Sequence, residues 1–371
     1  MAEKTETLRE RLGAVIPFAE KQVERMITKY PKRFPVFTIE GAWSLGEYER
    51  DNWMEGFFPG IMWILYGATQ KAVWRERAVQ TSRMIEQRKN DEKSHDLGFL
   101  FECTYQRAFE ATQQSEWQKV MIEAAETLAK RYQPQGHYLC SCYGQESLLI
   151  DQMMNVSLLY AAAQAKNDRG LFRMARNHTL TTRRFLLRGD GSTVQEGFFD
   201  RISGEFLKPA TRQGWRADSC WARGLAWALV GFTKVYTFTR DAHDLASAEL
   251  IAQYFLENAP AHGVPPNDFD EPGPRYAFET SAAAISAGGL WQLAHLTGDV
   301  SKAVLFRQSA LQILDTLTSN HFLAIESPEW EGILKHGIYH SRLGAGVDES
   351  LIFGDYYFLD AVCSALNDDT W

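Results

Sequence analysis

A carboxylate stands in one of the most apolar stretches of this chain. The segment SLLIDQMMNVSLLYAAA, residues 147–163, is apolar in nearly every direction and carries Asp151 near its start. Moving an unpaired charge out of water costs several kcal/mol or more. In a helix Asp151 shares a face with Asn155, four residues on, so the two predict a polar stripe that points into a cavity.

Desolvation in that cavity favours the protonated carboxyl, which suits a group that must give and take a proton near neutral pH. A buried Asp that is held by backbone groups or by an arginine has the same sequence pattern. Both interpretations of Asp151 therefore stand at this point.

A second carboxylate, Asp96, lies in SHDLGFLFE, where another helix is expected to begin. As an N-cap it would accept hydrogen bonds from backbone N–H groups. If Asp96 also faces the cavity, the helix N-terminus keeps it ionised while Asp151 is pushed toward the neutral form. Two carboxyls in such different environments are typical of an acid and base pair.

The stretch TRQGWRADSCWARGLAW combines a cation with aromatic rings. Ser219, Arg223 and Trp227 recur every four residues, so they predict one stripe on a helix, and Gln213 and Trp215 lie in the loop before it. A fixed cation beside aromatic planes suits a uronate sugar, because the cation pairs with the carboxylate and the rings stack on the sugar. Tryptophan at helical spacing also occurs in ordinary cores.

Other chemistries lack a signal in this sequence. His336 and His340 stand four apart in HGIYH without an evident third ligand, and Cys140 and Cys142 in CSC are too close-spaced and isolated for a metal site. The motifs GxGxxG, GxxxxGK[ST], HExxH and GxSxG are absent. We therefore expect no metal and no cofactor.

Composition limits the compartment and the partners. The chain has 371 residues, 45% of them hydrophobic, and a formal net charge of −8, which argues against nucleic acid or an anionic membrane as a partner. No signal peptide is apparent, and no run approaches the roughly 18 to 20 apolar residues of a membrane span. We expect a soluble cytoplasmic protein, and the sequence does not indicate its oligomeric state.

Helical periodicity dominates the chain. The expected helices come in pairs, an apolar one followed by an amphipathic one, which predicts inner helices wrapped by an outer ring. The fold class is then all-α, an (α/α)6 barrel or six-hairpin toroid formed by one domain, residues 1–371. The helices are expected at 6–29, 53–68, 72–88, 96–113, 117–132, 150–165, 170–187, 219–239, 243–258, 279–297, 301–318 and 349–366.

Several segments together resemble one enzyme family. They are DNWMEGFFPGIMW, SHDLGFLFE, LLIDQMMNVSLLY, DGSTVQEGFFD, TRQGWRADSCWARGLAWALVGF and GVDESLIFGDYYFLDA, in order from about residue 40 to the end. The chain resembles the unsaturated glucuronyl hydrolases of glycoside hydrolase family 88. The resemblance implies an (α/α)6 barrel that removes a 4,5-unsaturated uronic acid from the non-reducing end of lyase-generated oligosaccharides, by hydrating a vinyl ether without a metal.

The resemblance also implies roles for individual residues. Asp151 becomes the proton donor to C4 and then the base that activates water for attack at C5, and Asp96 the second essential carboxylate. The substrate-contacting positions are Trp53, His95, Gln195, Gln213, Arg223 and Trp227. The family usually has His where this chain has Gln195, which retains hydrogen bonding but carries no charge.

Three other functions remain open from the sequence. They are an unsaturated rhamnogalacturonyl hydrolase of the same fold, an inverting glycosidase that acts on saturated sugars, and a toroid that binds sugar without catalysis. The inverting enzyme needs two carboxyls about 6.5 to 9.5 Å apart around a water. The sequence does not indicate which unsaturated oligosaccharide is preferred or whether sulfate is tolerated.

Overall fold

The computed structural model describes residues 2–45, 52–274 and 276–368, with side chains described from residue 7 onward. Every segment predicted to be helical contains helix in the structure. The internal contacts divide the chain into two compact units, which we call unit 1 and unit 2. Unit 1 comprises Met1–Thr81, Ala259–Asn267 and Pro274–Trp371, and unit 2 comprises Ser82–Asn258 and Asp268–Gly273. The single domain expected from the sequence stays a prediction.

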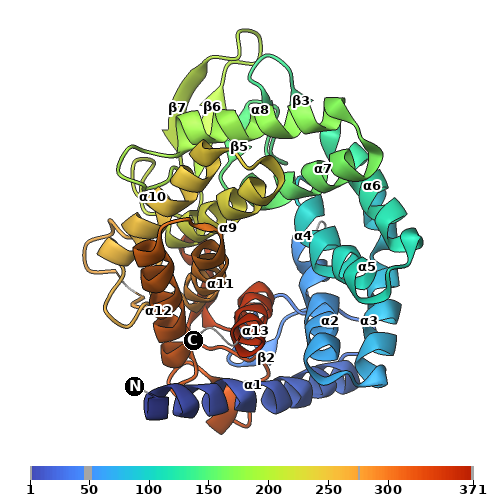
Figure 1. Cartoon of the computed structure of the whole chain (residues 1–371), viewed down its shortest axis with the longest axis vertical. Helices are drawn as coiled ribbons and strands as arrows, with labels where there is room; N and C mark the ends of the chain where they lie inside the picture. Colours follow the sequence, from blue (N-terminus) through green and yellow to red (C-terminus); the bar gives the residue numbers. More distant parts are fainter. Residues whose placement is uncertain (1, 46–51, 275, 369–371) are drawn as a thin grey trace. The chain divides into compact units, whose positions relative to one another are not determined.

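Unit 1 holds both ends of the described chain. Its helix α11 packs against α12 and α13, and α13 also packs against α2 (Figure 1). The elements of unit 1 are α1 (Ala2–Lys29), β1 (Thr38–Ile39), β2 (Ala42–Trp43), η1 (Trp53–Gly56), α2 (Phe57–Thr69), α3 (Ala72–Met84, which ends in unit 2), α11 (Thr280–Leu296), α12 (Val300–Leu317), η4 (Ala324–Glu326), β8 (Gly337–His340), η5 (Ser341–Leu343), β9 (Ala345–Glu349) and α13 (Ile352–Leu366).

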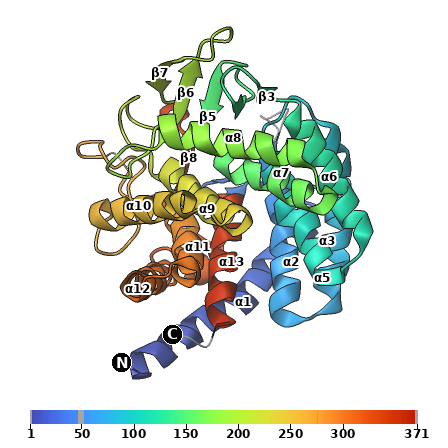
Figure 2. The same cartoon turned by 45° about the horizontal axis from the view of Figure 1, so that its top comes forward.

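Unit 2 holds most of the residues that the sequence singled out. Helix α7 packs against α8 and α9, and α9 against α10 (Figure 2). Its elements are η2 (Glu86–Asn90), α4 (Leu97–Phe101), the π-helical turn η3 (Glu102–Gln106), α5 (Arg107–Thr112), α6 (Ser115–Ala129), β3 (Tyr132–Gln133), β4 (Tyr138–Leu139), β5 (Ser147–Leu149), α7 (Gln152–Lys166), α8 (Arg169–Leu186), β6 (Glu196–Phe199), β7 (Phe206–Ala210), α9 (Ala222–Thr239) and α10 (Ala242–Asn258).

The pair α7 and α8 shows how the predicted alternation arises. Helix α7 is buried around most of its circumference, whereas α8 exposes one face. Asn167 ends α7 in the left-handed conformation, with φ 52°. The carboxylate of Asp168 then caps α8 by accepting hydrogen bonds from the N–H groups of Gly170 (2.8 Å) and Leu171 (3.1 Å). A two-residue turn therefore reverses the chain between the two helices.

A three-stranded antiparallel sheet of unit 2, in the order β5-β6-β7, has no counterpart in the helical prediction. Leu149 of β5 pairs with Glu196 of β6, and Glu196 pairs with Ala210 of β7. The N–H of Ile150 extends the pairing by donating to the carbonyl oxygen of Gln195 (2.9 Å). Because the three strands meet here, the chain after β5, the chain before β6 and the chain after β7 lie at one end of the sheet.

Two of the helices that carry predicted site residues begin later than expected. The helix expected at 150–165 begins at Gln152, so Asp151 lies in the turn before it. The helix expected at 219–239 begins at Ala222, because Ser219 Oγ donates to Asp268 Oδ2 (2.6 Å) and Trp221 forms a β-bridge with Asp268.

Within the described residues, none of the helices combines the length and the apolar character needed to cross a membrane.

Candidate active site

Helices α4 and α7 approach each other so closely that only glycine fits at residue 98. A Cβ atom on Gly98 would lie 2.5 Å from the Cα of Asn155, so any other side chain would push the helices apart. The contact lets Asn155 Oδ1 accept a hydrogen bond from the N–H of Phe99 (3.0 Å) while its Nδ2 donates to Asp96 Oδ1 (3.3 Å). Asn155 therefore anchors the second carboxylate to α7.

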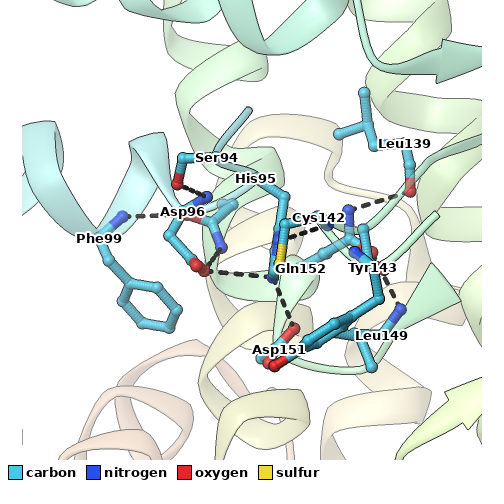
Figure 3. Close-up of polar contacts among 12 residues, drawn as sticks. Ser94, His95, Asp96, Phe99, Leu139, Cys142, Tyr143, Leu149, Asp151 and Gln152 are labelled. Carbon is cyan, nitrogen blue, oxygen red and sulfur yellow. Dashed lines mark hydrogen bonds and ion pairs between the residues drawn. The ribbon is translucent and has the colours of Figure 1, made fainter. Parts of the chain in front are cut away.

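His95 joins the two carboxylates. Its Nε2 lies 3.4 Å from Asp96 Oδ1 and 3.6 Å from Asp151 Oδ1, as the dashed lines of Figure 3 show. The imidazole is buried, with 3% of its surface exposed. Burial lowers the pKa of His95, but the negative charges of Asp96 and Asp151 outweigh it and raise the pKa well above its usual value.

A backbone contact fixes the ring of His95. The N–H of Cys142 donates to His95 Nδ1 (3.0 Å), and an atom that accepts a hydrogen bond cannot carry a proton itself. In the neutral ring the proton is therefore on Nε2, the atom that faces both carboxylates, and the Cys142 N–H opposes the second proton that the two carboxylates favour. The segment that carries Cys142 is held in turn at Leu139, whose carbonyl accepts from Gln152 Nε2 (3.0 Å) and whose N–H donates to His178 Nδ1 (3.1 Å).

Asp96 stands at the N-cap position of α4, but its side chain makes no capping hydrogen bond. Its own N–H donates to Ser94 Oγ (3.1 Å), and its carboxylate faces His95 and Asn155 instead. The interpretation of Asp96 as an ordinary cap is therefore wrong, because the carboxylate points away from the first backbone N–H groups of the helix.

The electrostatic state of Asp96 also differs from the expectation that a helix N-terminus keeps it ionised. Burial raises the pKa of Asp96 to about 6, and the neighbouring Asp151 charge adds to the shift, although His95 and Asn155 oppose it. Desolvation outweighs the short helix α4 because no capping hydrogen bond stabilises the carboxylate. Asp96 therefore takes up a proton close to neutral pH.

Asp151 follows β5 directly and has the least constrained carboxyl of the group. Its side chain is 19% exposed, and its Oδ1 has no hydrogen-bond partner among the described residues apart from the nearby His95 ring. The described residues include neither an arginine nor a backbone N–H bound to this carboxylate. The interpretation of Asp151 as a buried Asp with structural partners therefore has no support here.

Gln195 and Gln213 form one hydrogen-bonded unit at the same end of the β5-β6-β7 sheet. Gln195 is 4% exposed, and its Nε2 donates to Gln213 Oε1 (3.1 Å). Its Oε1 accepts from the side chain of Thr211 and from two backbone N–H groups of the turn that carries Gln213.

Arg223 and Trp227 lie on α9 as predicted, four residues apart and both buried. The Arg223 guanidinium stacks on the ring of Trp221, 4.5 Å from its centroid. The ring of Trp227 packs against Phe99 at 5.0 Å, which connects α9 to the first turn of α4. Ser219 does not share their helix, since α9 begins three residues later.

Trp53 and the two histidines of HGIYH lie in unit 1. The ring of Trp53 packs against Phe57 (5.7 Å) and Phe353 (5.2 Å). His336 Nδ1 lies 2.6 Å from Asp348 Oδ1, an ion-pair contact with no metal implied. Among the residues that the structure describes, no three His, Cys, Asp or Glu side chains are gathered in a way that could hold a metal ion.

Two residues beside the carboxylates escaped the sequence analysis. The ring of Tyr143 lies next to Asp151 in Figure 3, and the Arg212 guanidinium covers its face at 3.6 Å from the centroid. Buried Glu196 holds Arg212 through an ion pair of 2.9 Å. The only sequence signal was their position in polar loops beside apolar elements.

The comparisons with known proteins agree on one family. Residues 18–255 match glycosyl hydrolase family 88. An unsaturated glucuronyl hydrolase of Formosa agariphila is 32% identical over 84% of this chain and 79% of its own length. The crystal structure of the unsaturated glucuronyl hydrolase of Bacillus sp. GL1, described as responsible for glycosaminoglycan degradation, has a TM-score of 0.89 at 29% identity and covers 95% of this chain and 96% of that one.

A further solved structure is an Asp-to-Asn variant of such a hydrolase with dGlcA-Glc-Rha-Glc; it has a TM-score of 0.88 at 29% identity and covers 94% of this chain and 95% of that one. These matches confirm the predicted fold class, the (α/α)6 barrel of the unsaturated glucuronyl hydrolases. The chain therefore belongs to glycosyl hydrolase family 88 and is a glycoside hydrolase of the unsaturated glucuronyl hydrolase type, which removes the unsaturated uronic acid from oligosaccharides.

Proposed function

We propose that Asp151 is the acid and base of this hydrolase, assisted by His95 and Asp96. The observation that carries the proposal is the carboxyl of Asp151, whose one polar neighbour among the described residues is an imidazole 3.6 Å away that it shares with a second carboxylate. A carboxyl held by a single long contact remains available to a substrate. Asp96, in contrast, is already bound to Asn155.

The pair of carboxyls supplies the proton that the reaction needs. The negative charge of Asp151, which faces the same Nε2, adds to the burial that raises the pKa of Asp96 to about 6, so a proton is held beside Asp151 close to neutral pH. The Nε2–H of His95 then stabilises whichever carboxylate is ionised. We place the transferable proton on Asp151 in the complex with substrate.

The reaction begins with proton transfer from the Asp151 carboxyl to C4 of the unsaturated uronate. The C4=C5 electrons form the new C–H bond, and the ring oxygen stabilises the cation left at C5. The Asp151 carboxylate next takes a proton from water, whose oxygen bonds to C5 and gives a hemiketal. The hemiketal then opens: its C5–OH loses a proton as the bond between C5 and the ring oxygen breaks, and that oxygen takes up a proton, which leaves a ketone at C5 and a hemiacetal at C1. The hemiacetal hydroxyl loses a proton as the bond between C1 and the leaving sugar breaks, so the sugar departs as an alcohol, C1 becomes an aldehyde, and one water is consumed for each keto acid released.

The other predicted residues would hold the substrate. An amide such as Gln213 suits the hydroxyl or carboxylate oxygens of a uronate, and Arg223 supplies a planar cation that orders them. The half-buried ring of Trp53 offers an aromatic surface for a sugar ring, whereas Trp227 is buried against Phe99 and would support the site from behind α4. Gln195 is discussed separately below, because its hydrogen bonds run within the protein.

The proposed substrates are lyase products that end in a 4,5-unsaturated uronic acid. The related structures support this, since one protein is described as degrading glycosaminoglycan and another is bound to dGlcA-Glc-Rha-Glc. Of the proposed lyase products, those of glycosaminoglycan, xanthan and gellan carry unsaturated glucuronate. The cytoplasmic location expected from the sequence stays a prediction.

A panel of unsaturated disaccharides tests this assignment. We expect kcat/KM to be higher for unsaturated glucuronyl disaccharides from glycosaminoglycan or gellan than for unsaturated galacturonyl-rhamnose, by at least about 10-fold, since a single mismatched polar contact costs about this factor. Matched sulfated and unsulfated disaccharides belong in the panel. A preference for the galacturonyl-rhamnose substrate would instead make the chain an unsaturated rhamnogalacturonyl hydrolase.

A further inference from the structure

The side-chain carbonyl of Gln195 organises the turn after β7. Gln195 Oε1 accepts three hydrogen bonds, from Thr211 Oγ1 (2.5 Å), from the N–H of Arg212 (2.7 Å) and from the N–H of Gln213 (2.9 Å). The N–H of Gly214 extends the turn by donating to Thr211 Oγ1 (2.9 Å). A buried carbonyl that satisfies three donors holds their positions more firmly than a single hydrogen bond does.

The same contacts decide which way two amides point. Backbone N–H groups only donate, so the oxygen of Gln195 must face the turn and its NH2 group must lie on the other side. That NH2 group donates to Gln213, which therefore presents Oε1 to Gln195 (3.1 Å). The NH2 group of Gln213 is then directed away from Gln195.

We propose that Gln195 is a positioning residue that makes Gln213 a hydrogen-bond donor toward an acceptor oxygen of the uronate. This inference rests on the proposed function, in which Gln213 contacts the substrate. An imidazole at position 195 accepts at most one hydrogen bond at each ring nitrogen and cannot satisfy three donors at once. In this chain, Gln195 therefore contributes to recognition of the uronate by orienting Gln213.

The first test separates this role from a purely structural one. We expect Gln195→Met to raise KM about 10-fold, the usual cost of losing a hydrogen bond to a charged ligand. The kcat and its pH profile should stay within about 3-fold of wild type, because the proton transfer does not involve this turn. Gln253→Met is the matched control, since Gln253 is exposed on α10 and bonds only to Glu257 among the described residues.

A double variant tests whether Gln195 acts through Gln213. If it does, the KM of Gln195→Met combined with Gln213→Met equals that of Gln213→Met alone, because the second change removes the group that the first one orients. Multiplied effects on KM, or an unchanged KM in Gln195→Met, would overturn the inference.

Gln195→Glu is a second variant that tests the inference even if Gln195→Met does not fold. Its carboxylate keeps the acceptor for the three donors, so the melting temperature should stay near that of wild type. The other oxygen of the glutamate replaces the NH2 group that donated to Gln213, so Gln213 must turn its own NH2 group toward residue 195, and KM should rise. When Gln213 is replaced by Met as well, this increase in KM should disappear. An increase that persists there would mean charge repulsion and would contradict the inference. A wild type that leaves unsaturated disaccharides intact would overturn the proposed function as well.

Discussion

Asp151→Asn is expected to abolish turnover, with kcat reduced by at least about 10² to 10⁴-fold. The amide keeps the shape of the carboxyl but can neither give a proton to C4 nor take one from water. KM should change little, because the proposed binding groups are other side chains. The measurement is kcat and KM on an unsaturated disaccharide, together with a melting curve.

The melting temperature of this variant should stay within a few degrees of wild type. The carboxyl of Asp151 has no hydrogen-bond donor to lose among the described residues except the His95 ring at 3.6 Å. Asp315→Asn is a suitable control, because it makes the same chemical change at an exposed ion pair with Arg11. A kcat close to that of wild type would remove Asp151 from the chemistry.

Asp96→Asn should also lower kcat, by about 10²-fold, because the ring of His95 loses one of the two carboxylates that it faces. The wild-type rate should fall as the pH drops through about 6, where Asp96 becomes protonated. The residual activity of the variant should lack this acidic limb. The check is a rate profile of both proteins between pH 4.5 and 8.

The stability of this variant has a predicted sign. The pKa of Asp96 is raised in the folded protein to about 6 from its usual 3.8, so its contribution to stability is fully present below that lower value and is lost as the pH rises toward 6. The difference amounts to no more than about 3 kcal/mol. Relative to wild type, Asp96→Asn should therefore become more stable between pH 4 and pH 6.

Urea denaturation of both proteins at pH 4, 5, 6 and 7.5 measures this difference. A variant that keeps the wild-type rate but has a lower free energy of unfolding at every pH would show that Asp96 has only a structural role. That result would restore the interpretation of Asp96 as a helix cap, which its hydrogen bonds do not support.

The helices could be predicted because their signals are local. Apolar residues cover nearly all of α7, and Asn167 with Asp168 mark the turn to α8. The strands β5 to β7 could not be predicted, since they have only three to five residues each, and β5 pairs with β6 across about 50 positions of the sequence. The early start predicted for α9 has the same origin, because Ser219 is bound to Asp268, which is distant in sequence.

The sequence predicts those site residues whose type is unusual for their position. Asp151 stood out because a carboxylate is rare among apolar residues, and Asp96 because of its place before a helix. The shared contact with His95 was hidden, since it depends on the backbone N–H of Cys142, which every residue type carries. The role of Gln195 was hidden for the same reason, because two of the three donors to its carbonyl are backbone groups.

Following the C4=C5 ultraviolet band and the released sugar in one reaction tests the central claim, hydration of the vinyl ether. The substrate is an unsaturated glucuronyl disaccharide, and its saturated counterpart is the control. We predict that the band disappears no later than the leaving sugar is released, mole for mole, and that the saturated disaccharide stays intact. Sugar release that runs ahead of the loss of the band, or cleavage of the saturated disaccharide at a similar rate, would contradict the account.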